Sequence, residues 1–418
     1  MQVLYPRCAG LDVHKKTVVA CVLTSTSKGT ATPVVKTFKT ITRDLEALSA
    51  WLVTLQVEQV CLESTGVYWW PVFNLLEEAG LPVTLVNARD AKQLPGRKTD
   101  VGDALWLADL CRHGLVRASF IPPAEIRVLR ELTRYRATQV QARAREVQHL
   151  LKTLASANLQ LGSVASNVVG ASGWQMLEAV AAGEVDPHTL AAMAKRMLRR
   201  KLDELEQAFI ARVQPHHRLL IQTSLDLLRF LEGSIEALDQ AITAAAAPFA
   251  AQLAALDAVP GIGTVAAAAL VAEIGVNMDQ FPTAGHLASW AGVCPGNKQS
   301  GGKRLSSKTT KGNIWLRRIL GEAAWAAIRE QHSIFRARYY RLKPRLGAQQ
   351  ALVAVMHQLL KVIYRMLKTG ELYRELGADY DQTADPRRAV QRLTKRLERL
   401  GFTVTLAPGL FSFLKVDT

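Results

Sequence analysis

The first part of the chain shows the short apolar runs that are typical of a sheet interrupted by helices. Two β-rich runs lie within residues 7–23 on either side of a polar turn at 14–16, and a third spans 32–40. The spacing of apolar positions then alternates between the helical period of 3.6 residues and the strand period of two. This pattern predicts a helix over 42–55, a strand over 59–63, a helix over 70–79, a strand over 81–86 and a helix over 100–112. We expect a mixed sheet flanked by helices, because that arrangement buries all of these apolar faces.

The pattern becomes helical and highly charged from residue 126 to about 247. Apolar positions between Leu129 and Leu154 follow helical spacing, and arginines fill the positions between them. Two further helical regions are predicted over 189–213 and 219–242. This pattern favours a long antiparallel helical arm that contacts a partner, with most of its arginines on a solvated face.

A third pattern begins near residue 248. A helix is predicted over 265–274, a polar, glycine-rich loop over 296–304, and a basic helix from about 313. A helix over 347–367 follows, and the tail after 372 predicts a basic helix and a small strand pair. The fold class is therefore α/β plus all-α. Four parts are expected: a sheet domain over 1–120, a helical, coiled-coil arm over 121–247, a mainly α-helical C-terminal domain over 248–372 and a basic extension over 373–418.

The charge balance narrows the class of partner. The 418 residues include 52 Lys and Arg against 36 Asp and Glu, a formal net charge of +16. This excess favours phosphate-bearing partners, although charge alone does not separate nucleic acid from an anionic membrane. The alanine-rich stretch 241–276 is interrupted by proline and acidic residues, so we interpret it as packed helices and expect no membrane partner. No signal peptide is visible, which favours a cytoplasmic location.

Cysteine and histidine usage gives no metal-site pattern. None of the five cysteines forms a Cys-x-x-Cys pair, and four lie in apolar segments of the first part, at Cys8, Cys21, Cys61 and Cys111. A reduced thiol there behaves as a small hydrophobe, which favours a reducing compartment over a zinc site. We interpret His216 and His217 as a surface pair.

Four acidic residues occupy notable positions in the predicted sheet domain. Asp12 lies inside the first strand, Glu63 ends the fourth, and Asp100 and Asp103 lie three apart at the start of the last helix. If the first and fourth strands are neighbours, the four carboxylates converge at one end of the sheet. Their repulsion requires protons or cations, and hard oxygen ligands suit Mg²⁺ or Mn²⁺, two of which support phosphodiester chemistry.

Each acid also has a structural interpretation. Asp100 and Asp103 complement a helix N-terminus, and Glu63 could start the following turn. Asp12 is harder to explain in this way, because a carboxylate between apolar strand residues is costly to bury without a partner. Taken together, the four positions favour a metal site.

The C-terminal part carries two candidate phosphate-binding segments. In the loop at 296–304, two glycines follow Ser300 and let a ligand approach the backbone closely. The sequence Pro260-Gly-Ile-Gly263 resembles the turn of a helix-hairpin-helix, where backbone amides receive a phosphate. The alternative is a tight interhelical turn without a ligand, and the basic loop that follows slightly favours phosphate contact. The residues expected to contact nucleic acid are Lys298, Lys303, Arg304, Lys308, Lys311, Arg317, Gly261 and Gly263.

These segments together resemble a known family. The sequences Gly-Leu-Asp12-Val-His-Lys, Leu-Glu63-Ser-Thr-Gly-Val-Tyr and Arg97-Lys-Thr-Asp100-Val-Gly-Asp103 are similar to the RuvC-like, ribonuclease H-fold domain of the DEDD transposases of bacterial insertion sequences. The Pro295-x4-Ser300-Gly-Gly frame and the basic segment after it resemble the C-terminal domain of the same transposases. The resemblance covers about 7–112 and 250–370.

The resemblance implies a mechanism and partners. It makes Asp12, Glu63, Asp100 and Asp103 a metal-binding quartet for Mg²⁺ or Mn²⁺ and Ser300 the nucleophile that forms a covalent phosphoserine link to DNA. It also implies a homo-oligomer, a dimer or tetramer, in which the metal site of one subunit meets the serine of another. A bridging non-coding RNA would pair with target and donor DNA. The expected location is the bacterial cytoplasm, at the nucleoid.

Two other functions fit the residues less fully. A RuvC-like junction nuclease would use metal-activated water, leaving Ser300 only a phosphate contact. A nucleic-acid-binding regulator would need neither the acids nor the serine.

Overall fold

The computed structural model describes residues 2–25, 31–63, 66–86, 100–296, 298–301, 303–306, 308–378, 380 and 386–406. For residues 100–101, 298–300, 303–305, 386–389 and 392 only the backbone is described. The chain forms two compact units, 1–121 and 122–418. The finer division into four parts stays a prediction.

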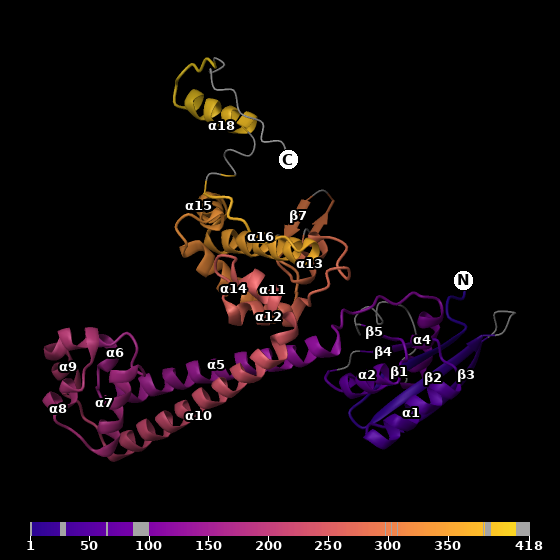
Figure 1. The fold of residues 1–418 in the computed structure, drawn as a ribbon, viewed down its shortest axis with the longest axis horizontal. Helices are drawn as coiled ribbons and strands as arrows, with labels where there is room; N and C mark the ends of the chain where they lie inside the picture. Colours follow the sequence, from indigo (N-terminus) through magenta and orange to yellow (C-terminus); the bar gives the residue numbers. More distant parts are fainter. Residues whose placement is uncertain are drawn as a thin grey trace. The chain divides into compact units, whose positions relative to one another are not determined.

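The first unit is built on a five-stranded mixed sheet. Its strand order is β3-β2-β1-β4-β5, with β1, β2 and β3 antiparallel and with β4 and β5 parallel to β1 (Figure 1). The predicted fold class is confirmed, and the predicted bounds are close to those found. The elements are β1 Arg7–Val13, β2 Thr17–Ser25, β3 Ala31–Lys39, α1 Thr42–Thr54, β4 Gln59–Glu63, α2 Trp69–Glu78, β5 Val83–Val86 and α4 Asp100–Arg112.

Helices cover both faces of the sheet. Successive strand residues point to opposite faces, so Leu11 and Leu62 join a core with residues of α1 and α2. Cys8 and Cys61 face the other way and pack against α4. Because β1 is covered on both sides, its sequence is almost continuously apolar, and a charged residue within it is conspicuous.

The predicted burial of four cysteines is confirmed. Burial raises the pKa of the Cys21 thiol to about 11. The pKa of Cys8 is raised chiefly by its hydrogen bond with Cys111, and that of Cys111 chiefly by its hydrogen bond with Cys61. The thiols of Cys8, Cys21 and Cys111 therefore stay protonated, and they pack between the sheet and α4.

The second unit begins with an antiparallel helix pair. The long helices α5 (Ala124–Ser156) and α10 (Pro215–Ala246) lie side by side (Figure 1). Arg136 pairs with Asp239 and Arg143 with Glu232, so rising numbers on one helix meet falling numbers on the other. The antiparallel pairing predicted for the arm is confirmed, and its contact with a partner stays a prediction. Its tip is a separate apolar cluster formed with α6 Leu161–Val164, α7 Ala171–Ala182, α8 Pro187–Ala192, η1 Arg196–Lys201 and α9 Leu202–Phe209.

Two predictions for the arm are wrong. The region 189–213 is not one helix, because it breaks into α8, η1 and α9. His217 is buried and is not a surface residue. Its Nδ1 accepts from the backbone N–H of Gln214 at 3.1 Å, which caps α10.

The rest of the second unit is mainly helical. The loop predicted at 296–304 forms a short antiparallel hairpin instead, because Gly301 adopts the left-handed conformation that a tight turn requires. The elements are η2 Ala247–Phe249, α11 Ala250–Asp257, α12 Thr264–Ile274, α13 Ala284–Trp290, β6 Lys298–Ser300, β7 Lys303–Ser306, α14 Ile314–Arg329, α15 Ile334–Leu346, α16 Ala348–Thr369 and α18 Pro386–Arg399.

The predicted basic tail helix is confirmed as α18, and 402–406 forms no strand. The other half of the expected strand pair lies outside the described residues. Among the helices of the described ranges, none has the length and apolar character needed to cross a membrane.

Candidate active site

The sheet brings Asp12 and Glu63 to the same edge. Leu11 of β1 pairs in parallel with Leu62 of β4, so the next residues, Asp12 and Glu63, lie level at the carboxyl ends of neighbouring strands. Each follows a leucine that faces α1 and α2, so the side chains of Asp12 and Glu63 point to the opposite face, which α4 covers. Asp12 is 5% exposed, whereas Glu63 is partly exposed.

Helix α4 runs antiparallel to β1 and starts at this edge. Cys8 Sγ lies 3.3 Å from the carbonyl oxygen of Ala108, and Gly10 lies against Ala104 and Ala108. A Cβ atom at Gly10 would come within 2.3 Å of the α4 backbone, so only glycine permits this approach. Asp12 follows Gly10 by two residues along β1, and the N-terminal turn of α4 lies one helical turn before Ala104.

That first turn carries the other two predicted acids. Asp100 is the first residue of α4, and Asp103 is partly buried one turn later. The backbone therefore directs all four acidic positions toward one end of the sheet. Among side chains that the structure describes, no three His, Cys, Asp or Glu residues form a metal-binding group, and the side chain of Asp100 lies outside that set. The quartet therefore stays a prediction.

The donor chemistry fits the expected ion. Carboxylate oxygens are the preferred ligands of Mg²⁺ and Mn²⁺, and the nearby cysteines are buried between the sheet and α4. The acidic positions come from three elements that the sheet and Gly10 hold in fixed register. A divalent ion at this edge would therefore be bound by Asp12, Glu63, Asp100 and Asp103.

His14 is a residue that sequence reasoning did not assign. Its Nε2 lies 3.1 Å from Oδ2 of Asp12, so the imidazole is a polar partner of the buried carboxylate. The available signal was the spacing: residues two apart at a strand end share a face.

The segment around Ser300 is a β-hairpin. Ser300 and Lys303 pair across the turn, and a Cβ atom added at Gly301 would meet nothing within 4 Å. At the base, Gly296 N–H donates to the carbonyl of Lys308 at 2.9 Å. The side chains of Ser300, Lys298, Lys303 and Arg304 are outside the described set. The structure therefore gives the turn and register of the hairpin, and the nucleophile role of Ser300 stays a prediction.

Two glycines fasten the hairpin to the helical core. A Cβ at Gly292, after α13, would come within 2.6 Å of Gly312 N, and a Cβ at Gly312 would come within 2.2 Å of Ala291. The backbones before and after the hairpin are thus in direct contact. Of the predicted cationic contacts beyond the hairpin, Lys308 and Lys311 are exposed and Arg317 is partly exposed.

A buried carboxylate, also missed by sequence reasoning, ties the arm to the start of α14. Glu273 of α12 is 1% exposed. It accepts two hydrogen bonds from Arg134 of α5, at 2.7 and 2.8 Å, and one from Asn313 Nδ2 at 2.5 Å. Asn313 in turn caps α14 by accepting from the N–H groups of Trp315 and Leu316. We call these three residues, Arg134, Glu273 and Asn313, the Glu273 hub.

A second arginine supports the hub. Arg130 donates to the backbone carbonyls of Ala272 and Glu273 at 2.8 and 2.7 Å. Burial lowers the pKa of Arg130 to about 10, and the Glu273 carboxylate opposes that shift, so the guanidinium is charged at neutral pH. Arg130 and Arg134 therefore hold α12 to α5 through charge-assisted hydrogen bonds. Glu273 in turn accepts from Asn313, so the residue that immediately precedes α14 is held in place as well.

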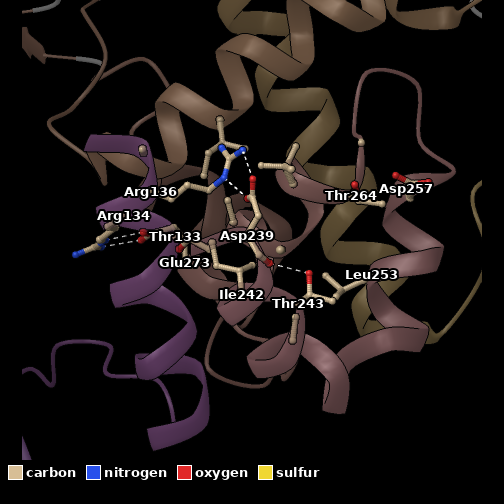
Figure 2. A pocket seen from close by; sticks show the side chains of 18 of the residues that line it. Thr133, Arg134, Arg136, Asp239, Ile242, Thr243, Leu253, Asp257, Thr264 and Glu273 are labelled. Carbon is tan, nitrogen blue, oxygen red and sulfur yellow. Dashed lines mark hydrogen bonds and ion pairs between the residues drawn. The ribbon is translucent and has the colours of Figure 1, made fainter. Parts of the chain in front are cut away.

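The predicted phosphate turn lies beside a cavity of about 1110 Å³ between α5, α10, α11, α12 and α14 (Figure 2). Gly261 has φ +85° and packs on the α14 backbone, where a Cβ would lie 2.2 Å from Ala323 O. This contact explains Gly261 by packing. Gly263 and Thr264 line the cavity at the start of α12, whereas Arg136 is bound to Asp239. Phosphate binding at Gly261 and Gly263 stays a prediction.

Two parts of the chain match models of transposase families. Residues 9–158 match a family model for the DEDD transposases of IS110, described as transposase, and residues 253–340 match one described as transposase IS116/IS110/IS902 family. Together the matched ranges cover more than half of the chain, and they include all four acids and Ser300.

A curated relative and a solved structure show more limited likeness. The chain is 34% identical over 120 residues to the insertion element IS110 uncharacterized 43.6 kDa protein of Streptomyces coelicolor, which covers 28% of this chain and 29% of that relative. The Thermus thermophilus RuvC structure aligns with 27% of this chain and 99% of its own, at 18% identity and a TM-score of 0.22. The chain thus spans less than a third of the curated relative it matches. On the two family models, which meet in one chain in the expected order, this protein belongs to the IS110 family of insertion-element transposases.

Proposed function

We propose that this chain cuts and rejoins DNA as the transposase of an insertion element, with Ser300 as its nucleophile. The observation that carries the proposal is that the two family-matched ranges together contain the predicted reactive residues, with the four acids in 9–158 and Ser300 in 253–340. The shared edge of Asp12 and Glu63 and the hairpin turn at Ser300 support it.

The proposed reaction conserves the phosphodiester bond energy. The Ser300 hydroxyl oxygen attacks a DNA phosphorus, the bond to the 3′ oxygen breaks, and that oxygen leaves as a 3′-hydroxyl with the proton that the serine has lost. A phosphoserine link to the 5′ end of the downstream fragment remains. Attack on this link by a 3′-hydroxyl then rejoins DNA and releases the serine.

A serine hydroxyl is a weak nucleophile and requires activation. A divalent ion held by Asp12, Glu63, Asp100 and Asp103 would polarise the scissile phosphate when bound. Lys308, Lys311 and Arg317, together with Lys303 and Arg304 of the hairpin, would neutralise charge that develops on the phosphate oxygens. The cations and the acids lie on different units, which suits the expected homo-oligomer in which one subunit complements another.

We extend the proposal to site selection by a bridging non-coding RNA that pairs with target and donor DNA. The formal charge of +16 suits two nucleic-acid partners. No helix-turn-helix or zinc-finger sequence is recognisable, so base pairing is the simplest source of specificity.

The serine is tested by covalent attachment. Wild-type protein incubated with its element DNA is expected to give a protein–DNA adduct stable to detergent, and Ser300→Ala is expected to give none while binding DNA normally. Ser306→Ala is the matched control, because Ser306 lies in the same hairpin but its Oγ accepts from Lys308 N at 3.1 Å. An undiminished adduct in Ser300→Ala would refute the assignment. Cleavage without any adduct in the wild type would indicate a water-using junction nuclease.

Metal binding by the acids is tested with two aspartates of the same helix, α4. Asp103→Asn is expected to abolish cleavage and to remove the rise in Tm that Mg²⁺ gives the wild type. Asp109→Asn, also on α4 but 3.4 Å from Arg112, is expected to keep both. Equal behaviour of the two variants would exclude Asp103 from the metal site.

A further inference from the structure

Helices α14 and α15 present an aromatic and basic surface to which neither the family comparison nor the predicted site assigns a role. Trp325 of α14 is 45% exposed, and Tyr340 of α15 is 50% exposed. Buried Tyr339 lies between them, with ring centroids 5.8 Å from Trp325 and 5.3 Å from Tyr340, both at steep angles. The buried Tyr339 ring thus packs against both exposed rings and restricts their motion.

Two cations lie beside the exposed Tyr340 ring. The Arg336 guanidinium lies 5.1 Å from the centroid of Tyr340, and Lys343 Nζ lies 5.9 Å from it. Arg336 is itself anchored, because its Nη1 donates to the carbonyl of Ile328 at 3.1 Å. Helix α15 also carries Arg338, Arg341 and Arg345 and contains no acidic residue.

A surface of this composition favours one class of ligand. Large exposed aromatic rings are costly in water, and anchored rings beside Arg and Lys supply both a stacking platform and a phosphate contact. Duplex DNA hides its base faces, so such rings gain nothing from it. A single strand offers an unpaired base to the ring and its phosphate to the cation.

We propose that Trp325 and Tyr340, with Arg336 and Lys343, form a binding surface for single-stranded nucleic acid, on which an unpaired base stacks. RNA loops and unpaired DNA share this chemistry. The inference deepens the proposed function by assigning a surface to its nucleic acid. It is tested by binding alone, so a missing phosphoserine adduct and a missing stacking surface are separate outcomes.

The experiment is fluorescence anisotropy of the full chain with labelled single-stranded RNA, single-stranded DNA and blunt duplex DNA of one sequence. Base stacking accounts for roughly tenfold or more in affinity per base. Tyr340→Ala and Trp325→Ala are therefore each expected to weaken single-strand binding about tenfold. Tyr340→Phe, which keeps the ring, is expected to stay within about twofold of the wild type, and duplex binding is expected to be unchanged in all three variants.

Tyr135→Ala is the matched control. Tyr135 is 56% exposed on α5, but its neighbours Arg134 and Arg136 are bound to Glu273 and Asp239. This variant is expected to bind like the wild type. Lys343→Gln is expected to reduce the slope of log affinity against log salt by about 0.7, the value for one phosphate of a single strand.

The outcomes separate clearly. Loss confined to RNA or to DNA supports the surface and identifies the strand it serves, and loss with both supports a platform that accepts either. Single-strand affinities within twofold of the wild type in both alanine variants would overturn the proposal. An equal loss of duplex binding would overturn it as well, because a duplex offers no base face to a ring.

Discussion

Replacing Glu273 by glutamine tests whether the Glu273 hub fastens α12 and α14 to the arm. The side chain keeps its size but loses its charge. Its carboxylate is 1% exposed and accepts from Arg134 twice and from Asn313 once. The amide of glutamine has one acceptor oxygen, and its NH₂ group would face donors of the guanidinium or of Asn313.

The magnitude follows from these contacts. Breaking a buried ion pair by removing one charge costs about 3–5 kcal/mol. The Arg134 side chain is 29% exposed and can recover part of its hydration, which reduces the loss. We therefore expect Glu273→Gln to lower the local free energy of opening of α12 and α14 by about 2–3 kcal/mol.

Amide hydrogen exchange measures this loss locally, without requiring the two units to unfold as one. A loss of 2–3 kcal/mol corresponds to exchange about 30- to 150-fold faster in peptides from α12 and the first turns of α14. Peptides from α7 at the tip of the arm are expected to be unchanged.

Glu322→Gln is the matched control. Glu322 lies 3.1 Å from Arg318 on α14, but its side chain is 70% exposed. Such a surface pair contributes about 0.5 kcal/mol or less, so exchange is expected to rise about twofold at most. Rates in Glu273→Gln within threefold of the wild type would refute the reasoning, as would an equal rise in the control.

Three other predictions concern tight packing and pH. Gly10→Ala is expected to displace α4 from β1, because the new Cβ would lie 2.3 Å from Ala104 O, and to abolish cleavage and lower the Tm of the first unit. Gly261→Ala is expected to destabilise the second unit by several kcal/mol in denaturant unfolding, whereas Gly263→Ala, whose Cβ would meet nothing within 4 Å, should leave it stable. Burial lowers the pKa of His357 below its usual 6.5, so the unfolded chain takes up this proton more readily and stability is expected to fall as pH drops below 6.5. In His357→Gln the free energy of unfolding should therefore depend less on pH over this range. A pH dependence equal to that of the wild type would contradict the assignment.

Local sequence determined much of the first unit. The apolar runs and helical periods predicted its strands and helices in order, and charges among apolar residues singled out Asp12. The neighbouring arrangement of β1 and β4 could be anticipated only as a condition for the acids to meet. The parallel pairing of Leu11 with Leu62 supplies that condition.

Other features depended on long-range contacts that no local pattern encodes. The break of 189–213 into three short helices and the burial of His217 follow from packing at the tip of the arm. The loop around Ser300 became a hairpin because residues on either side of a glycine turn pair with each other. Its polar composition, which suggested a loop, was compatible with both.

The sequence by itself determined which chemistry is available: carboxylates for a divalent ion, a serine before two glycines and a strongly basic chain. Tertiary structure decided which of these groups share a place and which residues hold them there. Gly10 permits α4 to approach β1, and Glu273 joins Arg134 to Asn313 across about 180 residues of chain. Such contacts join residues far apart in the chain, and burial, which sets their strength, exists only once the core has formed.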